Sequence, residues 1–143
     1  MSTRAPSADK ATRHRVLIVD DEESMRLFLA RILTTVLKVE VTLAGTCEQA
    51  LRLAGNYAYD AILLDLLMPG VGGFEVLKEL RRASPNMATP VIIVSVLSDA
   101  PTRDRCAQAG ANAYVVKPVE RNSLVTTVKA QIAGRGKPKN GGK

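Results

Sequence analysis

The chain has 143 residues, of which 46% are apolar and 3% are aromatic, and it contains no Trp. This length suits a single domain with a largely aliphatic core. Few aromatic rings are available to stack on single-stranded nucleic acid, so we expect no direct nucleic-acid binding. No apolar run approaches the ~20 residues of a membrane span, and the N-terminus lacks the apolar region of a signal peptide, so we also expect no membrane insertion.

The net charge of +6 is concentrated at the two ends of the chain. Residues 1–14 hold three bases and one acid, residues 133–143 hold four bases and no acid, and residues 15–132 hold thirteen of each. Segments with the composition of these two ends cannot bury enough apolar surface to fold. We therefore predict a folded domain over 15–133, flanked by disordered basic tails at 1–14 and 134–143, the second being a tail or the stub of a linker. The alternative is a basic arm for an acidic partner or nucleic acid.

Strand and helix patterns alternate along the folded part. In chain order, the sequence predicts strand 16–19, helix 25–36, strand 39–43, helix 47–54, strand 61–64, helix 74–80, strand 91–94, helix 102–109, strand 114–116 and helix 124–132. Four of the strands are continuous apolar runs, which is typical of strands buried on both faces of a parallel sheet. The run 39–43 alternates with period two, as a more exposed edge strand does. Apolar residues at helical spacing define the helices, of which 102–109 is short and weakly apolar.

This alternation predicts an α/β fold, a (βα)5 unit with no internal repeat. Right-handed crossovers then give a doubly wound parallel five-stranded sheet of the flavodoxin-like type, in the order 2-1-3-4-5. Cys47 and Cys106 fall in predicted helices and form no CxxC or Cys/His group. We expect both to be buried as small apolar side chains, in keeping with a reducing, cytoplasmic location.

Polar side chains follow the predicted strands at the points where the strands end. Asp20 and Asp21 follow the first strand, Asp65 the third, Ser95 the fourth and Lys117 the fifth. Because open α/β sheets bind ligands beyond the carboxyl ends of their strands, these groups should converge in one crevice. Each alone has an ordinary structural explanation, such as a helix cap or an exposed lysine, but the combination on four strand ends indicates a site.

The chemistry of these groups suits a metal-assisted phosphoryl site. Clustered carboxylates raise one another's pKa unless a cation intervenes, and hard oxygen ligands without His or Cys suit Mg²⁺. Lys117 and Ser95 could neutralise charge on a transferring phosphoryl group. Asp65 then becomes a possible nucleophile that forms an aspartyl-phosphate.

The residues from about Arg15 to Ile132 resemble the receiver domain of two-component response regulators, in the style of stand-alone, chemotaxis-type receivers. The resemblance rests on four motifs in this order: Val-Asp-Asp at 19–21, Asp-Leu-Leu-Met-Pro at 65–69, the hydroxyl residue Ser95, and Ala-Tyr-Val-Val-Lys-Pro at 113–118. The segment 109–114 is also similar to the family's approach to its fifth strand. The order and spacing of these motifs together make the signal specific.

The resemblance implies a role for each of these residues. Asp65 would be the phosphoacceptor, modified to 4-aspartylphosphate. Mg²⁺ would be bound by Asp21, Asp65 and the backbone carbonyl of Leu67, with Asp20 acting largely through water.

Ser95 and Lys117 would contact the phosphoryl group, and the bond between Lys117 and Pro118 is expected to be cis. Ser95 would turn inward on phosphorylation and Tyr114 would follow it to a buried rotamer, so the two would act as the switch. The surface formed by the helix 102–109, the strand 114–116 and the helix 124–132 would then change.

The family also implies the partners. The phosphoryl group would come from a histidine kinase or a histidine phosphotransfer protein, and a downstream protein would dock on the changed surface. The chain would be a regulatory phosphoacceptor and not an enzyme, promoting only its own phosphorylation and dephosphorylation.

The chain departs from the family's usual pattern at a few positions near the site. Gly72 stands where an Asp is common, before Gly73, and glycine is an acceptable N-cap. Val96 replaces the usual Ala or Gly after the hydroxyl residue. Leu67 and Leu97 are apolar where polar groups are frequent, which affects the rates expected and not the reaction.

Three alternatives remain open from the sequence. The chain could be the N-terminal receiver fragment of a larger response regulator, with its basic C-terminus as a truncated linker. An aspartyl-phosphate phosphatase of the haloacid-dehalogenase-like type is a remote alternative, because those proteins carry Asp-x-Asp on the first strand and this chain has adjacent Asp20 and Asp21. A receiver-like module that never takes a phosphate is opposed by the intact set of polar residues.

Overall fold

A computed structural model describes residues 13–134, and the predicted tails lie almost entirely outside this range. Five strands form one parallel sheet in the order β2-β1-β3-β4-β5. The strands are β1 (Arg15–Val19), β2 (Glu40–Ala44), β3 (Ala61–Leu64), β4 (Val91–Ser95) and β5 (Ala113–Val116). The helices are α2 (Glu23–Ile32), η1 (Leu33–Leu37), α3 (Cys47–Asn56), α4 (Gly73–Arg82), α5 (Ala100–Gln108) and α6 (Arg121–Gly134). The predicted fold class and strand order are confirmed.

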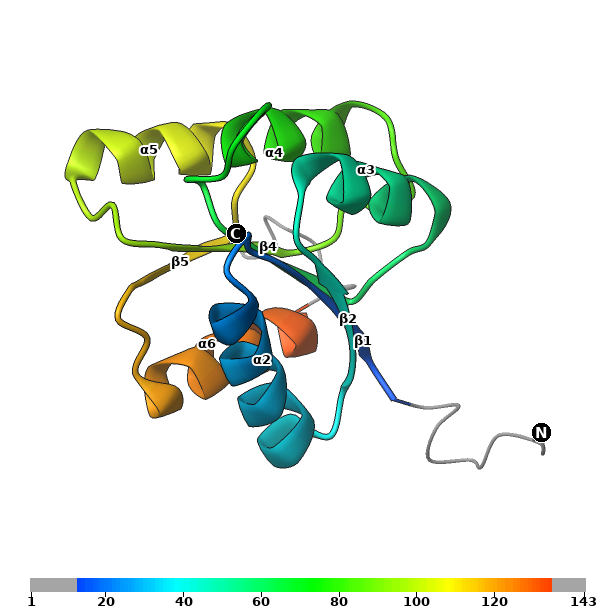
Figure 1. The fold of residues 1–143 in the computed structure, drawn as a ribbon, viewed down its shortest axis with the longest axis vertical. Coiled ribbons are helices and arrows are strands. Elements are labelled where there is room, and N and C mark those ends of the chain that lie inside the picture. Colours follow the sequence, from blue (N-terminus) through cyan, green and yellow to red (C-terminus); the bar gives the residue numbers. More distant parts are fainter. Residues whose placement is uncertain (1–12, 135–143) are drawn as a thin grey trace.

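Helices cover both faces of the sheet, as Figure 1 shows. α3, α4 and α5 lie on one face, and α2 and α6 lie on the other. Successive residues of β1 point to opposite faces, so Leu17 and Val19 join the core under α3 and α4, whereas Val16 and Ile18 join the core under α2 and α6. This two-sided burial explains why the inner strands are continuous apolar runs. β2 is the edge strand that its alternating pattern predicts.

The first helix differs from the prediction of one regular helix over 25–36. α2 is regular to Ile32, and the chain then forms a π-helical turn, η1, that ends before Lys38. Lys38 has φ 59°, the left-handed conformation that commonly closes a helix. Leu33, the first residue of this wider turn, is fully buried, with 0% of its surface exposed. The apolar residue therefore stays in the core although the helix is no longer a regular α-helix.

Both cysteines are buried free thiols, as the sequence predicts. Within the part of the chain that the structure describes, none of the helices combines the length and apolar character needed to cross a bilayer.

The loop between β3 and α4 requires glycine at two successive positions. Gly72 caps α4 with φ 89°, a conformation open to glycine at little cost. A Cβ on Gly73 would lie 2.7 Å from the Cα of Leu66, a distance that packed atoms do not reach. The Gly72–Gly73 pair therefore lets the start of α4 press against the chain just after Asp65. An Asp at position 72 would be strained in this backbone conformation.

Candidate functional site

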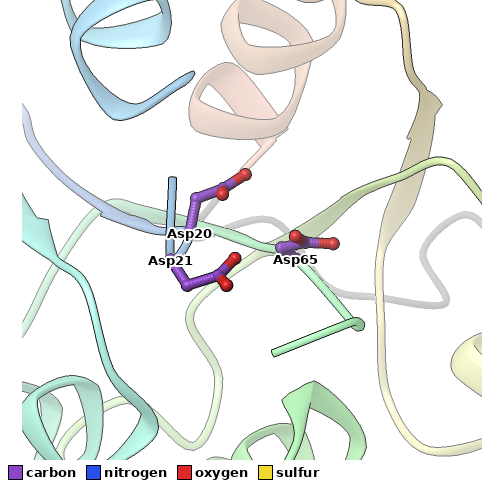
Figure 2. A group of neighbouring side chains, drawn as sticks. All are labelled: Asp20, Asp21 and Asp65. Atoms are coloured by element: carbon purple, nitrogen blue, oxygen red, sulfur yellow. The ribbon is translucent and has the colours of Figure 1, made fainter. Parts of the chain in front are cut away.

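Three carboxylates converge at the carboxyl edge of the sheet, as the sequence predicts. Asp20 and Asp21 follow β1 and Asp65 follows β3, and Figure 2 shows their side chains gathered together. One carboxylate oxygen from each lies within 4.8 Å of the others, so the group has the spacing of a metal-binding site. Asp20 and Asp65 are buried, with 1% and 5% of their surface exposed, whereas Asp21 is open to solvent.

Lys117 enters the cluster from the end of β5. Its ammonium Nζ lies 2.8 Å from Oδ2 of Asp20 and 3.2 Å from Oδ2 of Asp65, and only 10% of its side chain is exposed. The backbone N–H of Lys117 donates to the carbonyl of Ser95 at 2.8 Å, which fixes the start of this loop against β4. The peptide bond from Lys117 to Pro118 is cis, as the family resemblance implies.

Burial and neighbouring charges shift the pKa values within this cluster. Desolvation raises the pKa of the Asp65 carboxyl above its ordinary value, and the charge of Asp20 adds to this, while the charge of Lys117 opposes it. The pKa of Lys117 is also raised, because its bonds and charge interactions with Asp20 and Asp65 outweigh the cost of burial. Lys117 therefore stays charged and holds two buried carboxylates close together.

The two acids that follow β1 differ in how far their polar groups are engaged. Asp20 uses four polar atoms: its N–H donates to Ala44 O at 3.1 Å, its carbonyl accepts from Arg26 at 2.7 Å, and its carboxylate accepts from Glu22 N–H at 2.9 Å and from Lys117. Asp21 is exposed beside it. Of the pair, Asp21 is the carboxylate more open to an incoming ligand. The contact from Arg26 is one that the sequence analysis missed.

Ser95 and Tyr114 meet at the backbone of Leu97. The hydroxyl oxygen of Ser95 accepts the N–H of Leu97 at 3.2 Å, and the hydroxyl of Tyr114 donates to the carbonyl of Leu97 at 2.7 Å. Ser95 is fully buried and Tyr114 is half-buried, with the guanidinium of Arg103 over its ring at 4.8 Å. The residues predicted to form the switch are thus joined through one peptide segment.

Two apolar side chains stand at the rim of the site. Leu67 and Val96 have 51% and 57% of their surface exposed. The N–H of Leu67 donates to Oδ1 of Asp65 at 3.3 Å, which holds the backbone of the predicted carbonyl ligand next to the acid. Leu97, the next residue after Val96, is half-buried and packs against the core under α3 and α4.

The model of the response regulator receiver domain family matches residues 16–129. The chain belongs to this family. Receiver domains take part in phosphorylation-based signalling in two-component systems, and the matched range covers the sheet, the acid cluster and Lys117.

Curated relatives of this receiver domain are longer proteins. The chain is 33% identical over 122 residues to the response regulator GacA of Pseudomonas aeruginosa, which covers 85% of the chain and 56% of GacA. It is 37% identical over 116 residues to the sensory/regulatory protein RpfC of Xanthomonas campestris, covering 80% of the chain and 16% of RpfC. The receiver domain therefore spans about half of GacA and a small part of RpfC.

Solved receiver structures share the fold. The receiver domain of the sensor histidine kinase PA1611 from Pseudomonas aeruginosa is 30% identical and matches with a TM-score of 0.77, over 85% of this chain and 99% of that chain. That structure holds a magnesium ion coordinated in its active-site cleft.

Proposed function

We propose that this receiver domain accepts a phosphoryl group on Asp65 from a histidine kinase or a histidine phosphotransfer protein, with Mg²⁺ bound beside it. The observation that carries the proposal is the meeting of Asp65, two further carboxylates and Lys117 at one sheet edge. In the transfer, a carboxylate oxygen of Asp65 attacks phosphorus, the O–P bond forms, and the P–N bond to the donor imidazole breaks. The imidazole then takes a proton from solvent.

The donor set fits Mg²⁺. It consists of hard carboxylate oxygens with no sulfur or imidazole among them, within a spacing that one ion can bridge. As the family resemblance implies, Asp21, Asp65 and the carbonyl of Leu67 would be ligands, while Asp20 would act largely through water. When bound, the ion would neutralise negative charge on the phosphoryl oxygens.

Lys117 and Ser95 would contact the phosphoryl group. Lys117 already carries its charge to within 3.2 Å of an Asp65 oxygen, so it needs little movement to meet a phosphoryl oxygen there. Ser95 ends β4, on the strand next to β3, and its side chain can turn inward so that the hydroxyl donates to a phosphoryl oxygen, a rotation that would break the bond it now accepts from Leu97.

The same rotation would carry the signal outward. Releasing Ser95 from the N–H of Leu97 frees the segment whose carbonyl accepts the hydroxyl of Tyr114. Tyr114 would then settle deeper, and the surface of α5, β5 and α6 would change for a downstream protein. One phosphoryl group would thereby shift the equilibrium between two packings of the same residues.

We further propose that the chain is a cytoplasmic regulatory phosphoacceptor and not a turnover enzyme. The same chemistry would apply if the receiver were part of a larger response regulator. This second candidate is favoured by the match to GacA, because the chain covers 56% of that protein.

The proposal is tested by incubating the protein with acetyl phosphate or a phosphorylated histidine kinase, with and without Mg²⁺. Intact mass should show one added phosphoryl group, acid-stable and base-labile, that needs Mg²⁺ and is absent in Asp65→Asn. The matched control is Asp104→Asn, which removes an exposed carboxylate of α5 and should leave labelling unchanged. Label retained in Asp65→Asn would reject the assignment.

A further inference from the structure

Arg26 connects three segments next to the acid cluster. It lies in the first turns of α2, where helical side chains point back toward the N-terminus, and its Nη1 donates to the carbonyl of Asp20 at 2.7 Å. The Asp20 N–H in turn donates to Ala44 at the end of β2. The side chain is half-buried, so this bond is sheltered from solvent.

The segment after β2 leaves a space that the guanidinium fills. A Cβ on Gly45 would lie 2.8 Å from Nη1 and 3.2 Å from Cζ of Arg26. Gly45 has no unusual φ, and its N–H donates to the side chain of Gln49, so the backbone alone would accept alanine there. A side chain at position 45 would therefore have to displace the flexible end of Arg26.

We infer that Arg26 is a positioning residue for the metal-binding acids: by holding the carbonyl of Asp20 it fixes the peptide that leads into Asp21, and Gly45 provides the room it needs. Asp21 is exposed and stands directly after the carbonyl that Arg26 holds, so the orientation of this proposed ligand depends on that peptide plane. Residues that orient metal ligands without touching the metal commonly change metal affinity ten- to a hundredfold when removed.

This inference rests on the proposed Mg²⁺ site, and a set of variants separates the two. Mg²⁺ affinity is measured by titration calorimetry, and folding by thermal unfolding in EDTA. Arg26→Ala should weaken Mg²⁺ binding by about 10-fold, and Arg26→Lys, which restores a donor and the charge, should recover most of it. Arg31→Ala is the matched control, because it removes an exposed arginine of the same helix and should leave affinity unchanged.

Gly45 supplies a second, independent test through a double-mutant cycle. Gly45→Ala should weaken Mg²⁺ binding in the wild type by displacing the guanidinium, and should add little in the Arg26→Ala background, where the obstruction is gone. The inference would be overturned if the double variant lost Mg²⁺ affinity by the product of the two single losses. It would also be overturned if Arg26→Ala kept wild-type affinity while Asp21→Asn lost binding. Wild-type affinity in Asp21→Asn would overturn the metal site itself and this inference with it.

Discussion

The helices α4 and α5 lie side by side on one face of the sheet, yet they are attached to it very differently (Figure 1). α4 buries four residues, Gly73, Val76, Leu77 and Leu80. α5 buries Cys106 alone. A helix with one buried side chain can shift at low cost, whereas a helix with four cannot. We therefore expect a change at Asp65 to alter the position of α5 rather than that of α4.

Different side-chain contacts also hold the two helices. Arg81, in the last turn of α4, donates to the carbonyl of Gly110 at 2.8 Å and to the side chain of Asn112 at 2.9 Å. These bonds tie α4 to the segment that follows α5, whereas the helix α5 itself makes two cation–ring contacts, Arg105 over Phe74 of α4 at 4.0 Å and Arg103 over Tyr114 at 4.8 Å. Cation–ring contacts at exposed sites contribute about 0.5–1 kcal/mol each, so they add little to the attachment of α5.

The largest expected effect comes from opening the core beneath α4. Leu77→Ala should lower the free energy of unfolding by roughly 2–5 kcal/mol, because it removes a fully buried side chain and leaves a cavity. Cys106→Ala in α5 should cost about 1 kcal/mol, since it removes a single heavy atom. Urea unfolding of both variants provides the measurement. Equal losses would contradict the difference in attachment.

A smaller effect is expected at the polar contacts. Arg81→Ala should cost roughly 1–3 kcal/mol, because it leaves half-buried carbonyl groups without their donor. Arg105→Ala should cost about 0.5–1 kcal/mol, the usual range for an exposed cation–ring contact. The control is Arg82→Ala, whose exposed pair with Glu79 should contribute little. If Arg105→Ala proved the more damaging of the two, α5 would be better anchored than its burial indicates.

The carboxylate of Asp65 lies close to the start of α4 and should lower the stability of the fold, unlike the apolar anchors of α4. Its raised pKa means that the folded state binds the proton more tightly than the unfolded chain, so the ionised form is penalised at neutral pH. Asp65→Asn should therefore raise the melting temperature at pH 7. The gain should shrink as the pH falls through the raised pKa of the folded state and vanish below the ordinary value of 3.8, where both states are protonated. A gain that grows below pH 4 would show the sign to be wrong.

The smallest and slowest effect concerns loss of the phosphoryl group. Val96 narrows the entrance to Asp65 relative to alanine, so we expect slow phosphorylation by small donors. Leu67 and Leu97 cannot hydrogen-bond an attacking water, so we also expect a long-lived aspartyl-phosphate. Leu67→Asn and Leu97→Glu should shorten its lifetime several-fold, as followed on acid-quenched gels. A wild-type lifetime of seconds, unchanged in both variants, would mean that these side chains do not control access of water.

Much of this molecule could be predicted from its sequence, because the inner strands carry an unbroken apolar pattern. That pattern fixes which residues end each strand, and parallel strands bring Asp20, Asp65 and Lys117 to the same edge. The edge position of β2 followed from its alternation in the same way.

Contacts between side chains on different elements could not be predicted in this way. Arg26 reads as an ordinary polar position of an amphipathic helix, and its bond to the Asp20 carbonyl depends on how α2 meets the ends of β1 and β2. The π-helical turn at Leu33–Leu37 is likewise a response to packing, since the apolar spacing there fits a regular helix equally well.

The effect of Asp65 on the α5–β5 surface is tested most directly by hydrogen–deuterium exchange with and without beryllofluoride and Mg²⁺, since beryllofluoride mimics the acyl phosphate. We predict altered exchange in the 96–99 loop, α5 and β5, with the amides of α4 unchanged and no response in Asp65→Asn. Exchange that changes equally in α4, or that changes in Asp65→Asn as well, would contradict the claim that a phosphoryl group on Asp65 acts through the loosely attached α5–β5 surface.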